Sequence, residues 1–134
     1  MEDNILDSYG RFEPETRTDL LQIREMVLRV AQSNEAIGEI EETLKWGEPS
    51  YLTPQTKSGS TLRLSQTKTD LKPALFVNCQ TTLVDEIREL YPDAFDFEGT
   101  RGVVLKSSPN DVSQELEHTI ALVLTYHARK KHQK

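Results

Sequence analysis

The chain's single tryptophan lies in the run Glu42-Thr43-Leu44-Lys45-Trp46-Gly47-Glu48-Pro49-Ser50-Tyr51-Leu52. Gly47 can adopt the left-handed backbone conformation that ends many helices, and Pro49 does not fit a helix interior. The run therefore predicts the end of a helix, a sharp corner and the start of a strand. Such a corner would bring the aromatic rings of Trp46 and Tyr51 close to one another.

Two helices are predicted before this corner. Pro14 suits the first position of the first helix, and apolar residues then recur at three- and four-residue steps as far as Gln32. A second helix is predicted from about residue 34 to the corner, because its side chains would separate onto two opposite helix faces. The apolar face would carry Ile37, Ile40 and Leu44, and the acidic face Glu35, Glu39 and Glu42. Residues 1–13 show no consistent period and are interpreted as an N-terminal arm, which precedes a single domain at residues 14–132.

Beyond the corner the pattern predicts short strands and two more helices. Residues 51–52 and 61–64 flank a stretch of Thr, Ser, Gly and Pro, residues 73–79 are apolar at both alternating positions, and residues 95–97 and 103–105 flank a glycine-bearing turn. A middle helix is predicted between Thr82 and Pro92, and a long terminal helix after Pro109. Strands and helices do not alternate along the chain. The expected fold is therefore α+β, with a small, mainly antiparallel sheet packed against two N-terminal helices, the middle helix and the C-terminal helix.

The motif Lys45-Trp46-Gly47-Glu48-Pro49-Ser50-Tyr51, followed by residues 59–64 and 76–82, resembles the YdhG-like family of uncharacterised domains. The similarity covers nearly all of the chain from about Pro14, although the connection after Tyr51 is longer here. The resemblance implies a small bacterial α+β domain, and some members of that family are regarded as frataxin-like intracellular iron chaperones. It implies no catalytic residue.

Composition limits the partners that we expect. The 134 residues carry a formal net charge of −6, which disfavours binding to a nucleic-acid backbone. The basic run at the C-terminus fits the negative end of a helix dipole. The sequence contains no long apolar run of the kind found in membrane spans and signal peptides. A cytoplasmic location without a membrane partner is therefore expected. The chain could be a monomer or a homodimer, because the apolar stripe of the first helix suits either the core or a second copy.

Four residues form the candidate ligand site: Trp46, Glu48, Tyr51 and Arg101. The two aromatic rings could wall a pocket or could be core residues that support the corner. Arg101 could supply a cation to that pocket or pair with Glu98, and Glu48 could be a polar contact or an exposed loop residue.

Two other kinds of site were considered. Glu35, Glu39 and Glu42 offer oxygen ligands at one-turn spacing for a weakly held iron ion, but a solvated helix face has the same pattern. His118, His127 and His132 are interpreted as structural or solvated. Cys79 is the only cysteine, so an internal disulfide and a zinc site of several cysteines are excluded. It is predicted to precede a helix N-terminus, where a thiol can act as a nucleophile.

These patterns favour a non-enzymatic binding module with a cleft near the Trp46 and Tyr51 corner, which would hold a small molecule or the side chains of a protein partner. Iron is the only cofactor considered. The alternatives are an iron chaperone that uses the acidic helix face and an enzyme that uses Cys79.

Overall fold

The protein has an α+β fold. The structure is a computed structural model that describes residues 2–131, with side chains from residue 5 onward. In chain order the elements are α1 (Glu2–Ser8), the 3-10 helix η1 (Tyr9–Arg11), α2 (Pro14–Gln32), β1 (Glu41–Lys45), β2 (Glu48–Leu52), β3 (Leu62–Gln66), β4 (Pro73–Phe76), α3 (Leu83–Leu90), β5 (Phe95–Glu98), β6 (Gly102–Leu105), the 3-10 helix η2 (Pro109–Val112), α4 (Ser113–Leu124) and α5 (Tyr126–Lys131).

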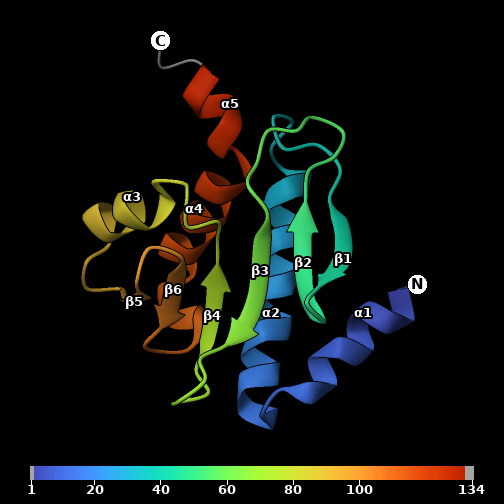
Figure 1. Cartoon of the computed structure of the whole chain (residues 1–134), viewed down its shortest axis with the longest axis vertical. Coiled ribbons are helices and arrows are strands. Elements are labelled where there is room, and N and C mark those ends of the chain that lie inside the picture. Colours follow the sequence, from blue (N-terminus) through green and yellow to red (C-terminus); the bar gives the residue numbers. More distant parts are fainter. Residues whose placement is uncertain (1, 132–134) are drawn as a thin grey trace.

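The strands of residues 2–131 form one six-stranded antiparallel sheet in the order β1-β2-β3-β4-β6-β5. Figure 1 shows helices α2 and α4 behind this sheet, while the face toward the viewer carries no helix. The core lies between the sheet and the helices, and the strands contribute buried side chains such as Leu62, Leu64, Leu75 and Val103. One sheet face therefore belongs to the core, and the other, which we call the open face, is left for solvent or a ligand.

The N-terminal residues belong to this core. The described part of the predicted arm is helical, as α1 and η1, and Ile5, Tyr9 and Phe12 are buried in the same cluster as the helix α2. The helix α2 begins at Pro14 and ends at Gln32, as its apolar period predicted.

The predicted helix over residues 34–46 is wrong. Residues 34–40 are a turn and an irregular connection, and residues 41–45 form the edge strand β1. Trp46 and Gly47 have φ values of 58° and 77°, and Lys45 lies opposite Glu48. Two successive residues with positive φ make the two-residue turn that suits the twist of a β-hairpin. The corner is thus the tip of the β1–β2 hairpin, and Gly47 serves that turn and not a helix end.

The later elements follow the predictions more closely. The pairing of β2 with β3 and of β5 with β6 confirms both predicted hairpins. The terminal helix is present but is interrupted at Thr125 between α4 and α5. In the part of the chain that the structure describes, no helix has the length and apolarity needed to cross a membrane.

Candidate functional site

The register of the sheet places two rows of side chains across the open face. Ser50, Arg63, Phe76, Gly102 and Glu98 follow one another across four strand pairs. In the second row, Ser65, Ala74, Val104 and Asp96 do the same. Successive strand residues point to opposite faces, so each of these side chains faces away from the core.

A small apolar cluster lies at the centre of this face. Ala74, Phe76 and Val104 are buried although no helix covers them. The neighbour of Phe76 on β6 is Gly102, where an added Cβ would lie 3.1 Å from Phe76 Cε1. The missing side chain leaves room for the phenyl ring. Arg63 covers that ring, with its Cζ 4.9 Å from the ring centroid, in a cation–π contact.

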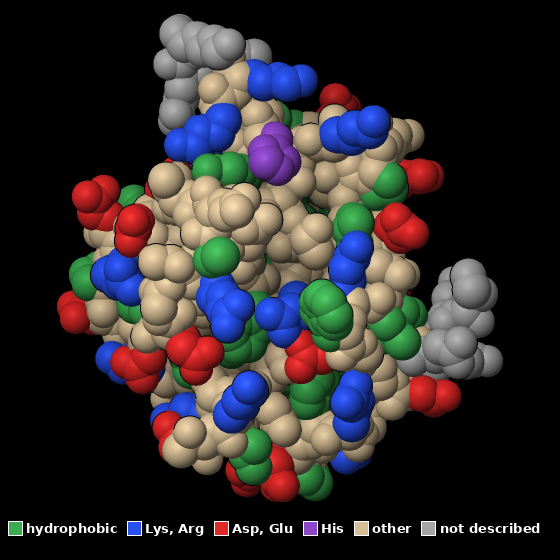
Figure 2. All heavy atoms as spheres, in the orientation of Figure 1, with side chains coloured by type: hydrophobic (Ala, Val, Ile, Leu, Met, Phe, Trp, Pro, Cys, Tyr) green, Lys and Arg blue, Asp and Glu red, His purple; other side chains and the backbone are tan. Residues whose placement is uncertain are grey.

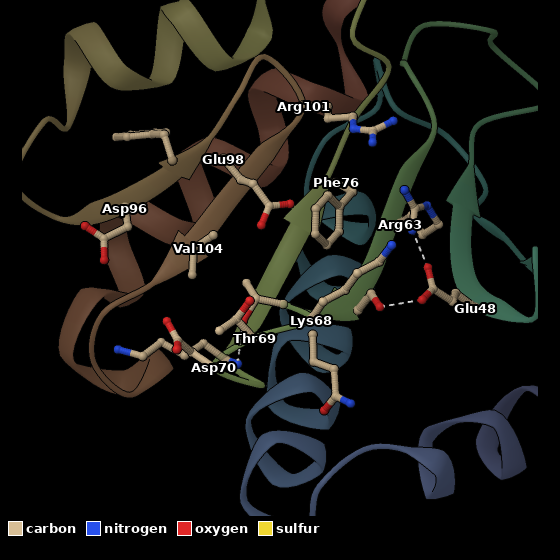
Figure 3. Close-up of a pocket in the computed structure, with 15 residues that line it drawn as sticks. Glu48, Arg63, Lys68, Thr69, Asp70, Phe76, Asp96, Glu98, Arg101 and Val104 are labelled. Carbon is tan, nitrogen blue, oxygen red and sulfur yellow. Dashed lines mark hydrogen bonds and ion pairs between the residues drawn. The ribbon is translucent and has the colours of Figure 1, made fainter.

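Three cationic side chains gather around Phe76: Arg63 on β3, Lys68 in the β3–β4 loop and Arg101 in the β5–β6 turn. We call them the cation cluster. Figure 3 shows all three extending toward the space beside the Phe76 ring, and Figure 2 shows basic side chains gathered at the middle of this face while most acidic ones lie nearer its rim. They line a hollow of about 710 Å³, whose lining also includes Lys72 and the four carboxylates of Glu48, Asp70, Asp96 and Glu98.

The members of the cation cluster differ in their partners. Arg63 forms an ion pair with Glu48, whose other carboxylate oxygen accepts a hydrogen bond of 2.5 Å from Ser65. Among the side chains of residues 5–131, the guanidinium of Arg101 has no ion-pair partner, and the predicted alternative of a pair with Glu98 is not formed. Arg101 therefore retains its hydrogen-bond donors for a ligand.

Trp46 stands beside this cluster. Its side chain is 91% exposed, and it lines a second hollow of about 310 Å³ together with Lys45, Arg63, Phe76 and Arg101. The hairpin tip is tied to the rest of the protein by Arg11, which donates a hydrogen bond of 2.5 Å to the carbonyl oxygen of Gly47. The structure thus brings Trp46 and Arg101 together, as the sequence analysis predicted, and places Glu48 in the neighbouring hollow.

Tyr51 does not belong to this site. Its ring is fully buried on the helix side of the sheet, and its hydroxyl lies 2.5 Å from that of Tyr9. Burial is the main cause that raises the pKa of both phenols well above the ordinary value, and the charge of Glu42 acts in the same direction. The predicted cleft between two aromatic rings is therefore incorrect, because Tyr51 on β2 faces the core whereas Trp46 lies in the hairpin turn and is exposed.

The predicted acidic metal site is not assembled. Glu35 and Glu39 lie in the connection before β1, whereas Glu42 is on β1, so the three do not share a helix face. Glu42 instead accepts hydrogen bonds of 2.6 and 3.0 Å from Nε and Nη2 of Arg24 on α2. No group of three potential metal ligands is found among the described residues.

Cys79 and the histidines do not form a catalytic group in the described part of the chain. Cys79 is exposed in the loop after β4 and does not lie at the end of a buried strand. It lines the hollow beside Trp46 and another hollow at the β5–β6 turn, and no histidine lines either of these two. His118 Nδ1 lies at hydrogen-bond distance, 2.5 Å, from the hydroxyl of Tyr91, and His127 is exposed. His132 lies outside the described residues.

The sequence pattern did not identify Arg63, Lys68 and Phe76 as site residues. Arg63 lies between Leu62 and Leu64, and such alternation is typical of a strand with one buried face, so Arg63 is expected to face outward. Its proximity to Phe76 depends on the β3–β4 register, which the polar connection between these strands does not specify.

The chain was also compared with protein-family models, with curated proteins and with solved structures, and none of the three comparisons gave a match.

Proposed function

We propose that the protein is a non-enzymatic binding module, and that it binds a small anion with a planar group on the open face. The observation that carries this proposal is the exposed indole of Trp46, which borders the same hollow as the guanidinium groups of Arg63 and Arg101. An exposed indole offers a large flat surface for a ring. A guanidinium offers paired N–H donors that match a carboxylate or a phosphate.

The charges of the site favour an anion. The hollow beside Trp46 is lined by Lys45, Arg63 and Arg101 and, among the described residues, by no carboxylate. Arg101 has no ion-pair partner within residues 5–131, so an anion there would meet a cation that is not neutralised in this way. Arg63 is held in place by Glu48 and by the ring of Phe76. Its position is therefore fixed before a ligand arrives, which lowers the entropy lost on binding.

The size of the site and the net charge favour a small molecule over a polymer. The hollow beside Trp46 has a volume of about 310 Å³, near the lower end of the range of roughly 300–1,000 Å³ typical of small-molecule sites. The net charge of −6 would repel a long polyanion while the local cluster attracts a single anionic group.

Fluorescence tests this proposal directly, because Trp46 is the only tryptophan. Aromatic carboxylates and aryl phosphates are titrated into the protein, with neutral analogues of the same rings in parallel. We expect a saturable change in Trp46 emission with the anions, and a dissociation constant raised about tenfold or more in Arg101→Gln, because a charge-assisted hydrogen bond is lost.

The matched control is Arg29→Gln, since Arg29 is also exposed but lies on α2 and pairs with Glu117 on the helix side. This variant should bind like the wild type. Equal binding by Arg101→Gln and the wild type, or no saturable change with any anion, would contradict the proposal. Tighter binding of a single-stranded oligonucleotide than of a mononucleotide would assign the site to nucleic acid instead.

A further inference from the structure

The strand β1 forms one border of the sheet. It pairs with β2 on its inner side, and within residues 2–131 no strand pairs with its outer side. Figure 1 shows β1 as the outermost strand at this border. An edge strand presents unpaired backbone N–H and C=O groups, which are a template for pairing with another strand.

The hairpin turn determines which backbone groups of β1 point outward. In a two-residue turn the closing residues, here Lys45 and Glu48, exchange hydrogen bonds with each other. Hydrogen-bonded positions alternate along an antiparallel pair, so Thr43 also bonds to β2. The N–H and C=O groups of Glu42 and Leu44 therefore point away from the sheet.

We propose that a second copy of this chain pairs with the outer side of β1, antiparallel and centred on Thr43. In that register Glu42 and Leu44 of one copy exchange backbone hydrogen bonds with Leu44 and Glu42 of the other. The two sheets become one continuous sheet across a two-fold axis. This inference does not depend on the proposed ligand or on Trp46.

Charge complementarity selects the second copy and this register. Glu41 and Lys45 point to the same face of β1, and pairing about Thr43 places Glu41 of each copy opposite Lys45 of the other. Both side chains are exposed in the single chain. A register centred on Glu42 would place two glutamates opposite one another, and a parallel arrangement in register would place like charges opposite one another along the strand.

Exposed apolar side chains lie at the same border. Leu44 on β1 is 40% exposed, and Leu6 on α1 is 47% exposed. The helix α1 packs against β1 and β2, so both leucines belong to the layer beneath this edge. Leu44 carries outward-pointing backbone groups, and its side chain would lie beside the partner strand. A second copy would cover part of this apolar surface, which adds a hydrophobic contribution to the backbone pairing.

A charge-exchange experiment tests the register. Sedimentation or light scattering is measured over a range of concentrations for the wild type, Glu41→Lys and Lys45→Glu. We expect a dimer for the wild type. We expect about a tenfold or greater rise in the dimer dissociation constant for each variant, because two attractive pairs become repulsive. Mixing the two variants should restore dimers, since every cross-strand pair is then Lys opposite Glu.

Circular dichroism and thermal unfolding of each variant establish that both fold. The control is Glu117→Lys, a charge change at a half-buried position on α4, which should leave dimerisation unchanged. Hydrogen exchange gives an independent measurement, because the amides of Glu42 and Leu44 should exchange more slowly as the protein concentration rises. A wild type that stays monomeric at all concentrations would overturn the inference. So would variants that dimerise as the wild type does, or a mixture that fails to restore the dimer.

Discussion

The hydroxyl groups of Tyr9 and Tyr51 meet in the core at a distance of 2.5 Å. The rings come from η1 and β2, 42 residues apart, and both are buried. Nearby, Arg24 and Glu42 form a partly buried ion pair, and the hydrogen bonds that Arg24 donates to Glu42 are the main cause that raises the pKa of Arg24. A buried hydroxyl without a partner is costly, and the hydrogen bond between the two phenols gives each oxygen one partner. This pair joins the N-terminal helices to the strand that leads away from Trp46.

The raised pKa values of these tyrosines predict a loss of stability at alkaline pH. In the unfolded chain the phenols ionise near pH 10, while the folded protein keeps them protonated to higher pH. The contribution of the two protonated tyrosines to the stability of the folded state is therefore fully present below pH 10. It is lost as the pH rises from there toward the folded-state pKa. The free energy of unfolding should fall by up to about 1.4 kcal/mol per pH unit for each tyrosine.

Chemical denaturation at pH 8, 10 and 11 measures this dependence. The variant with Tyr9→Phe and Tyr51→Phe should show a smaller fall between pH 10 and 11 than the wild type. Other groups that titrate in this range are common to both proteins and cancel in the difference. Identical pH dependences for the two proteins would show that the pair does not hold its protons in the folded state.

Among the elements, the β1–β2 hairpin departs most from the sequence prediction. Ile37, Ile40 and Leu44 have helical spacing by coincidence, since Ile37 is buried in the connection before β1 and Leu44 is on the edge strand. The sequence of β1 does not show the alternation of polar and apolar residues typical of a strand, because glutamates lie on both of its faces. Glu41 is in solvent and Glu42 pairs with Arg24. Gly47 favours either a helix end or a hairpin turn, and only tertiary packing decides between the two.

The left-handed conformation of Gly47 in the hairpin turn makes a prediction about stability. Gly47 has a φ of 77°, and an alanine in this left-handed region should destabilise the protein by about 1–2 kcal/mol. The added Cβ would also meet Arg11 Nη1, a flexible group that can move. The free energy of unfolding of Gly47→Ala is measured by urea denaturation. Gly10→Ala is the control, because Gly10 has open space around it and should change stability little. A neutral Gly47→Ala would contradict the turn.

For the whole molecule, the sequence pattern was sufficient to predict the α+β class. Turn-forming segments and alternating leucines identified β2, β3, β5 and β6, and the apolar periods identified α2 and α4. The candidate site was predicted only in part, since Trp46 and Arg101 share a hollow while Tyr51 lies in the core. The other features of the site depend on the sheet register and on the position of the helices on one face of the sheet. These are long-range features that local spacing does not contain.

That one-sided arrangement creates the surface on which we propose that a ligand binds. Because the described helices lie on the core side, no helix covers Ala74, Phe76 and Val104 at the centre of the other face. Arg63 provides both the cover and a positive charge, and the hairpin tip with Trp46 rises beside it. The site is therefore a consequence of the sheet order and of the β1–β2 turn together.

Nuclear magnetic resonance of the Trp46 indole N–H and the backbone amides tests the binding surface most directly, with an aryl phosphate as the added ligand. We expect saturable shifts at Trp46 and at residues around Arg63, Phe76 and Arg101, and none on α2 and α4. The same shifts should be strongly reduced in Arg101→Gln and kept in Arg29→Gln. Shifts confined to the helix side of the sheet, or shifts at Trp46 that do not depend on Arg101, would contradict the account.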